Sequence, residues 1–122
     1  MKTIILDSNF LMIPFQFKID IISEINRICN FKYELKIIDK TIDELENLNK
    51  KEAKAALKLI ENKKIRKIVT KKDKIVDDLI LELTDKNIIV ATQDKELKRK
   101  LKDKNTPIIV LRQKKYLKLE NI

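Results

Sequence analysis

Glycine and histidine are both absent from this sequence of 122 residues, and cysteine occurs once. Without glycine, the chain has neither a Walker phosphate-binding loop nor the glycine-rich turn of dinucleotide-binding proteins. Without histidine, it has no His-dependent catalytic triad or general base, and a single cysteine excludes an internal disulfide and a structural zinc site. These absences remove many of the common sites for nucleotides, zinc and nucleophilic catalysis.

Long hydrophobic runs are also lacking. The longest uncharged run, Ser8 to Phe17, is far too short to span a bilayer. The first residues lead directly into the apolar Ile4–Leu6, which does not resemble a signal peptide. We therefore expect a cytoplasmic protein without a membrane partner, folded as a single domain over residues 1–122.

Positive charge is abundant and unevenly placed. The net charge is +9, and the last 61 residues carry 18 basic and 9 acidic side chains, whereas the first 61 carry 10 of each. A one-sided basic surface is typical of nucleic-acid binding; the alternative is a lysine-rich composition that forms an ordinary solvated face. The densest basic region covers a short helix and an expected basic C-terminal tail at about 112–122, where Tyr116 either stacks on a base or packs the tail onto the domain. The residues that we predict to bind RNA are Lys98, Arg99, Lys100, Lys102, Arg112, Lys114 and Lys115.

The spacing of apolar residues predicts strands that alternate with helices. Strands are expected at residues 3–6, 35–38, 65–69, 87–91 and 108–111. Helices are expected at residues 20–29, 41–48, 53–60, 76–83 and 94–102. Several of the strands are uniformly apolar, which indicates an α/β fold with a parallel sheet covered on both faces.

Two acidic residues follow strands of this predicted sheet. Asp7 comes directly after the strand at 3–6, and Asp94 follows the strand at 87–91. Active sites of such sheets lie beyond the carboxyl ends of the strands, so these carboxylates lie side by side if the two strands are neighbours. Each is also explained as a simple helix N-cap.

Further acids lie on predicted helices. Thr41 and Glu44 have the Thr-x-x-Glu spacing of a capping box, which gives Glu44 a structural explanation. Asp77 and Asp78 fall in the first turn of an apolar helix, where carboxylates interact favourably with the helix dipole. Taken together, converging carboxylates without a partner histidine suit hard cations such as Mg²⁺ or Mn²⁺, which polarise water and neutralise phosphodiester charge.

The chain resembles a PIN domain along its whole length. Four motifs carry the resemblance, in order: Leu6-Asp7-Ser8-Asn9, Thr41-Ile42-Asp43-Glu44-Leu45, Val76-Asp77-Asp78-Leu79 and Thr92-Gln93-Asp94. The resemblance implies a three-layer α/β/α fold with a central parallel five-stranded sheet in the order 3-2-1-4-5, and metal-dependent cleavage of single-stranded RNA. By the same resemblance the catalytic and metal-binding acids are Asp7, Glu44, Asp77 and Asp94, with Asp78 as the alternative to Asp77, and Ser8 and Thr92 orient them. Asp43 is disfavoured because it lies one position early relative to Leu45 and Leu48.

The resemblance also suggests partners and roles. It implies a homodimer in many cases, and an exposed part of the segment around Phe10, Phe15 and Phe17 would indicate a dimer patch. The chain is similar to archaeal PIN proteins akin to rRNA-processing nucleases and to VapC-type toxins, so the expected partner is an antitoxin protein or a ribosome-assembly partner.

Two other functional classes are compatible with a basic α/β domain of this size. One is a non-catalytic RNA-binding PIN module in ribosome assembly. The other is a phosphoacceptor receiver domain, which requires an aspartate at the end of the third strand, where this chain has Val69-Thr70-Lys71. The second alternative is therefore disfavoured.

Overall fold

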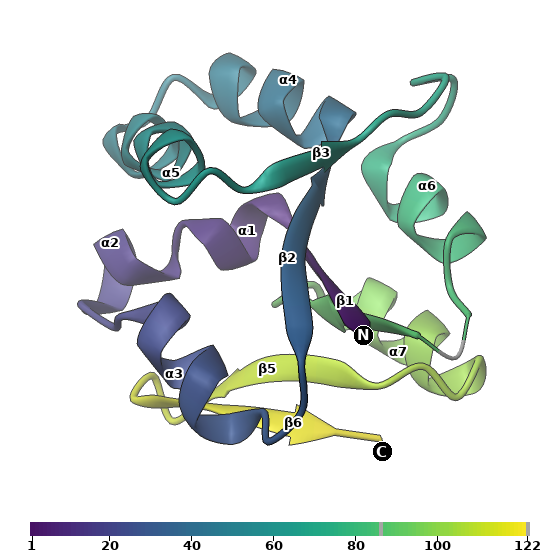
Figure 1. The fold of residues 1–122 in the computed structure, drawn as a ribbon. Helices are drawn as coiled ribbons and strands as arrows, with labels where there is room; N and C mark the ends of the chain where they lie inside the picture. Colours follow the sequence, from purple (N-terminus) through teal and green to yellow (C-terminus); the bar gives the residue numbers. More distant parts are fainter. Residues whose placement is uncertain (86, 122) are drawn as a thin grey trace.

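A six-stranded sheet forms the middle layer of the molecule (Figure 1). The computed structural model describes residues 1–85 and 87–121. The strands lie in the order β3-β2-β1-β4-β5-β6; the first five are parallel, and β6 runs antiparallel to β5. Their bounds are β1 Lys2–Leu6, β2 Tyr33–Ile38, β3 Arg66–Ile68, β4 Ile88–Ala91, β5 Ile108–Arg112 and β6 Tyr116–Glu120. The α/β class and the order 3-2-1-4-5 predicted from the sequence are confirmed.

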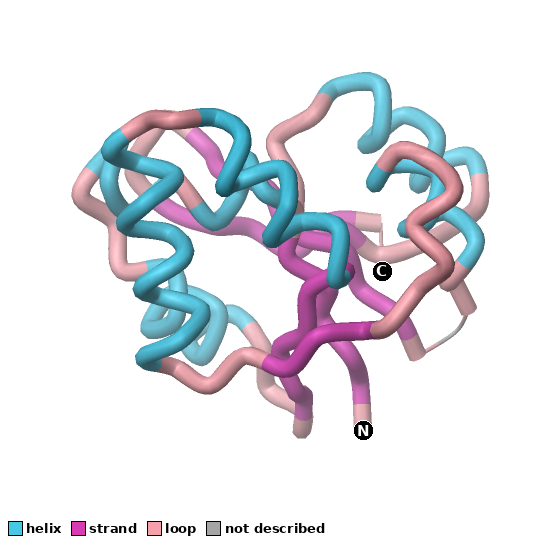
Figure 2. The backbone as a smooth tube through the Cα atoms, turned by 90° about the horizontal axis from the view of Figure 1, so that it is seen from above, coloured by secondary structure: helices cyan, strands magenta, loops and turns pink. Residues whose placement is uncertain are grey.

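Helices cover both faces of this sheet (Figure 2). One face packs against α1 Ser8–Leu11, α2 Ile13–Phe17, α3 Ile21–Ile28, α4 Asp39–Leu48 and α5 Lys51–Asn62, and the other against α6 Val76–Glu82 and α7 Lys95–Asp103. Side chains alternate between the faces of a strand, so Ile4 and Leu6 of β1 enter the first apolar cluster while Ile5 enters the second. No helix within the described residues is long and apolar enough to cross a membrane.

The C-terminal segment differs from the tail expected at about 112–122. Tyr116–Glu120 forms β6, and residue 122 of that expected tail lies outside the described part of the chain. Leu117 is 1% exposed, whereas Tyr116 and Lys118 point to solvent. This alternation has the period of a half-buried strand, but the surrounding lysines concealed it in the sequence.

Two short helices were also missed between Asp7 and Asp20. Phe10 and Met12 are buried there, while Phe15 on α2 is 41% exposed. Helices of four and five residues show too little of the helical period to be recognised from hydrophobic spacing. Their position matters, because α1 begins directly at the first candidate acid.

Candidate active site

The carboxyl ends of β1 and β4 bring two sequence motifs together. These strands are neighbours in the sheet, with Leu6 opposite Ala91. The N–H of Asp7 donates to the carbonyl of Ala91 at 2.9 Å. The hydroxyl of Thr92 donates to Oδ2 of Asp7 at 2.7 Å. The expectation that Asp7 and the Thr92–Asp94 motif share one edge of the sheet is confirmed.

Asp7 is a buried carboxylate, 3% exposed. Its Oδ1 accepts the N–H of Ser8 at 2.9 Å, so it caps α1 as the structural alternative anticipated. Burial raises its pKa from 3.8 to about 6, against the hydrogen bonds from Thr92 and Ser8, and the negative charges of Asp77 and Glu44 raise it further. Asp7 is therefore an N-cap by its hydrogen bonding, but its carboxylate charge is disfavoured by burial and by neighbouring acids.

Thr92 links Asp7 to Asp94. Its Oγ1 accepts the N–H of Asp94 at 3.1 Å while donating to Asp7. Oδ1 of Asp94 accepts the N–H of Leu97 at 2.9 Å, which makes Asp94 the N-cap of α7. One hydroxyl thus fixes the relative placement of two of the candidate acids.

Asn9 and Gln93 support this arrangement and were not recognised from the sequence. Oδ1 of Asn9 accepts the N–H of Gln93 at 3.1 Å. The side-chain amide of Gln93 donates to the carbonyl of Asn9 at 3.2 Å. The sequence signal was a side-chain amide within each of the two motifs. It does not show that Asn9 and Gln93 bind each other unless β1 and β4 are known to be adjacent.

Glu44 is not part of a capping box. Helix α4 begins at Asp39 rather than at Thr41, and Oδ1 of Asp39 accepts the N–H of Lys40 in its first turn at 2.9 Å. Thr41 is fully buried, and neither its Oγ1 nor Oε1 of Glu44 has a hydrogen-bond partner within the described residues. The Thr-x-x-Glu spacing therefore gave a wrong structural explanation, and Glu44 holds a buried oxygen that the fold itself does not satisfy.

The four candidate acids interact electrostatically. Burial raises the pKa of Glu44, as does the charge of Asp77, against a hydrogen bond from Ser8 and the charge of Lys40. Burial likewise raises the pKa of Asp77, and the charge of Asp94 raises it further while Lys100 lowers it. Asp77 is thus coupled to each of the other three acids.

The neighbouring acids are engaged differently. The charge of Asp78 is felt at Lys74 in the loop before α6 as well as at Asp77. Asp43 pairs with Lys72 of the same loop, with Nζ and Oδ2 3.0 Å apart. The charge of Asp77 raises the pKa of both Asp7 and Glu44, whereas Asp43 is paired with Lys72. The acidic group is therefore defined here as Asp7, Glu44, Asp77 and Asp94.

The donor set of the acidic group suits a hard divalent cation. It offers carboxylate oxygens, one of them buried and unpartnered, and at least three of its members have raised pKa values that a positive charge would lower. Within residues 1–85 and 87–121, no three of these side chains converge closely enough to hold one ion as they stand. Binding would therefore require the carboxylates to draw together around the ion.

The basic residues singled out from the sequence fall into four groups. Arg99 is neutralised by Glu96 at 2.6 Å and Asp103 at 3.4 Å. The charge of Lys100 lowers the pKa of Asp77. Lys98, Lys102 and Arg112 lie around a single carboxylate, Glu120, and Lys114 and Lys115 are exposed in the turn between β5 and β6.

The chain is similar to known PIN proteins in both sequence and structure. A family model described as a PIN like domain matches residues 4–114. Ribonuclease VapC4 of Methanocaldococcus jannaschii is 41% identical, over 98% of this chain and 97% of that protein. A solved structure of the PIN domain endonuclease Utp24 superposes with a TM-score of 0.86 at 27% identity, over 98% of this chain and 92% of that chain.

Proposed function

Because the chain belongs to the PIN domain family, we propose that it is a metal-dependent endoribonuclease that hydrolyses phosphodiesters in single-stranded RNA. The acidic group would hold Mg²⁺ or Mn²⁺, with Ser8 and Thr92 orienting the acids. The observation that carries the proposal is the electrostatic coupling of four carboxylates, three of which have raised pKa values and one of which, Asp7, is 3% exposed. Burying like charges destabilises a fold, and a bound cation would offset that destabilisation by neutralising the carboxylates.

Each residue of the site has a part in this chemistry. A bound divalent cation would make water a stronger nucleophile and neutralise charge on the phosphodiester. Thr92 keeps Asp7 and Asp94 in fixed relation, and Ser8 contacts both Asp7 and Glu44. The charge of Lys100 acts on Asp77, and the same charge would attract a phosphate of the substrate.

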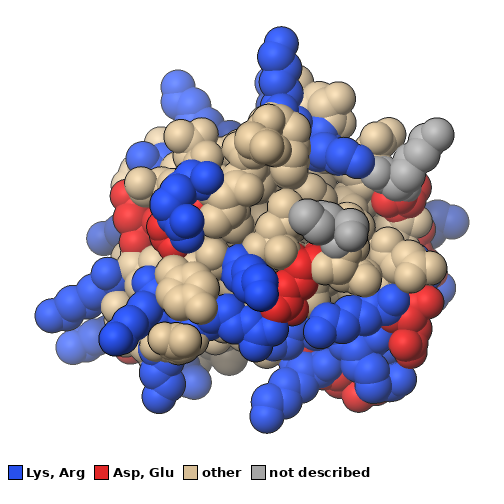
Figure 3. All heavy atoms as spheres, turned by 90° about the horizontal axis from the view of Figure 1, so that it is seen from below, with Lys and Arg blue, Asp and Glu red and all other residues tan. Residues whose placement is uncertain are grey.

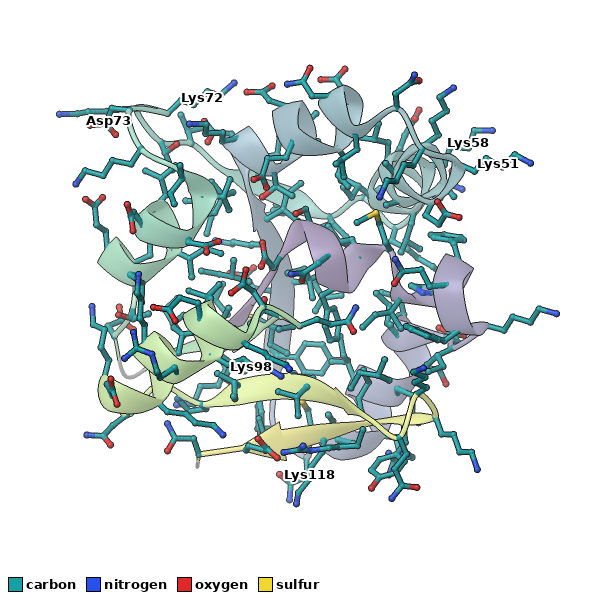
Figure 4. The ribbon with its side chains drawn as sticks, turned by 180° about the vertical axis from the view of Figure 1, so that it is seen from behind. Lys51, Lys58, Lys72, Asp73, Lys98 and Lys118 are labelled. Atoms are coloured by element: carbon teal, nitrogen blue, oxygen red, sulfur yellow. The ribbon has the colours of Figure 1, made fainter. Side chains whose placement is uncertain are left out.

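The basic surface supports RNA as the substrate. Basic side chains are spread over much of the face that includes the β5–β6 hairpin, with acidic side chains in smaller patches (Figure 3). Burial lowers the pKa of Lys98, as do the charges of Arg112, Lys102 and Lys95, and Glu120 only partly offsets them. Lys98 and Lys118 lie at this side of the molecule (Figure 4). We propose that Lys98, Lys102, Arg112, Lys114 and Lys115 contact the RNA backbone, whereas Arg99, which is paired with two acids, contributes less.

A non-catalytic RNA-binding module is the alternative function. Such a module has no use for an acidic group that repels phosphate and raises the pKa of its own members. The alternative predicts salt-dependent RNA binding without metal-dependent cleavage. Catalysis accounts better for the retained acids.

The test is cleavage of total RNA in Mn²⁺ by the wild type, by Asp7→Asn and by the control Asp73→Asn, which removes an exposed carboxylate. We expect discrete cuts from the wild type and Asp73→Asn, and none from Asp7→Asn. Equal cleavage by Asp7→Asn would contradict the proposal. Mapping of the cuts then distinguishes a toxin's target from an rRNA-processing site, and with it an antitoxin from a ribosome-assembly partner.

A homodimer is part of the proposal. Phe15 is 41% exposed on α2, within the segment whose exposure was expected to indicate a dimer patch. Light scattering should give about twice the chain mass of 14.5 kDa, and Phe15→Ser should lower it. A monomeric wild type at micromolar concentration would contradict this part of the proposal.

A further inference from the structure

The loop between β3 and α6 leads directly to Asp77 and is attached to the helix that carries Glu44. In Figure 1 this loop passes from the end of β3, next to α4, across to α6. Oδ2 of Asp39 accepts the N–H of Thr70 at 2.9 Å, and Oδ1 accepts the Thr70 hydroxyl at 2.6 Å. Nζ of Lys40 donates to the carbonyl of Lys74 at 2.6 Å. The first turn of α4 therefore holds the loop near its start and at its end, an arrangement called the α4 clamp here.

The middle of the loop is held less firmly. Lys72 pairs with Asp43 at 3.0 Å, but both side chains are about half exposed, and pairs of this kind contribute little. Figure 4 shows Lys72 and Asp73 at the outer end of the loop. Burial alone would raise the pKa of Asp39, yet hydrogen bonds from Thr70 and Lys40 and the charge of Lys72 bring it below its ordinary value. The loop is thus held most firmly by the part-buried hydrogen bonds from Thr70 to Asp39, and the exposed hydrogen bond from Lys40 to the Lys74 carbonyl is a second attachment.

The clamp acts at the start of a helix that is also held by apolar packing and by two polar contacts. Val76, Leu79 and Ile80 are buried in the apolar cluster on this face of the sheet. Lys74 pairs with Glu82, and Nζ of Lys104 donates to the carbonyl of Leu81 at 2.8 Å near the end of α6. Hydrophobic packing is non-directional and leaves a helix some freedom to turn or slide, whereas hydrogen bonds restrict direction and distance. Lys74 is three residues before Asp77, so its carbonyl is well placed to set the height of the first turn of α6. The charge of Lys40 also lowers the pKa of Glu44, so the side chain that binds the Lys74 carbonyl acts on one of the four acids directly.

We propose that Asp39 and Lys40 are positioning residues that hold the start of α6, and with it Asp77, next to the helix that carries Glu44, so that both acids can close around one divalent cation. This inference rests on the proposed function, because it assigns the clamp a role in metal binding. Neither residue touches the ion in this proposal. Supporting residues of this kind typically change metal affinity by about 10- to 100-fold when they are replaced.

The test measures Mn²⁺ binding without RNA, from the Mn²⁺ concentration that gives half of the maximal rise in melting temperature. We expect Asp39→Asn, Thr70→Val and Lys40→Met to weaken Mn²⁺ binding roughly tenfold. Thr70→Ser keeps the hydroxyl and should bind as the wild type does. Asp73→Asn removes a carboxylate from the same loop, and Lys51→Met and Lys58→Met remove lysines that project from α5 on the opposite side, so all three should be unchanged (Figure 4).

A double-mutant comparison separates positioning from general stability. In an Asp77→Asn background, Asp39→Asn and Thr70→Val should no longer weaken Mn²⁺ binding, because the ligand that they position is gone. Variants that lower the melting temperature yet bind Mn²⁺ like the wild type would overturn the clamp's role alone. An equal loss of Mn²⁺ affinity in the wild-type and Asp77→Asn backgrounds would do the same. A wild type that neither binds Mn²⁺ nor cleaves RNA would overturn the proposed function, and the clamp's role with it.

Discussion

Replacing Asp7 with asparagine should stabilise the protein at neutral pH in the presence of EDTA. The carboxyl has a pKa of about 6 in the folded chain and 3.8 in the reference state, a difference worth about 3 kcal/mol once both states are ionised. Asparagine keeps an oxygen for the Thr92 hydroxyl but loses the acceptor for the Ser8 N–H, which costs about 1 kcal/mol. The net gain is about 2 kcal/mol, or roughly 5 to 10 °C in melting temperature.

The pH dependence provides an internal check. Between the two pKa values the folded chain binds the proton and the unfolded chain releases it, so the wild type loses stability as pH rises from 3.8 to about 6. The destabilisation that the Asp7 carboxyl causes should therefore be about half as large at about pH 5 as at neutral pH. Chemical denaturation of the two proteins in EDTA measures this, with Asp73→Asn as an exposed control. An Asp7→Asn protein that is less stable than the wild type at neutral pH would refute the reasoning.

Other variants test further parts of the account. Asp77→Asn should reduce Mn²⁺-dependent cleavage at least 100-fold and Asp78→Asn only slightly, which single-turnover rates will show; the reverse order would assign the site to Asp78. Lys98→Met should reduce the slope of log K for single-stranded RNA against log salt by about 0.7, whereas an unchanged slope would remove Lys98 from the interface. Glu24 accepts the N–H of Leu117 at 2.9 Å and pairs with Arg27, so Glu24→Gln should cost about 1 kcal/mol. The bond with Arg27 lowers the pKa of Glu24, so this difference should shrink as pH falls through that depressed pKa, and a difference that grew at low pH would contradict the assignment.

Sequence reasoning was most successful where chain position alone determines placement. Asp7 and Asp94 follow strands whose ends lie at one edge of a parallel sheet, so their shared edge followed from the sheet itself. Glu44 depended on the family resemblance, since its local pattern indicated a capping box that the structure does not contain. Local patterns describe what a residue does within its own helix, whereas Glu44 interacts with Ser8 of α1 and with the charge of Asp77 on α6.

The remaining features depend on contacts between distant parts of the chain. Asp39 and Thr70 are 31 positions apart, and no pattern in either segment indicates their hydrogen bonds. Strand β6 has the period of a strand, but its burial depends on pairing with β5 and packing near α3. Charge density concealed the strand, because Lys114, Lys115 and Lys118 around Leu117 suggest a solvated tail as readily as a half-buried edge.

The central claim is that four carboxylates from four parts of the chain form one metal centre. Crystals soaked in Mn²⁺, with diffraction data collected at the manganese absorption edge, test it directly. The account predicts an anomalous peak at the carboxyl ends of β1 and β4, with oxygens of Asp7 and at least two other members of the acidic group within about 2.2 Å. The same crystals with no peak there, or with Mn²⁺ bound only elsewhere on the molecule, would contradict it.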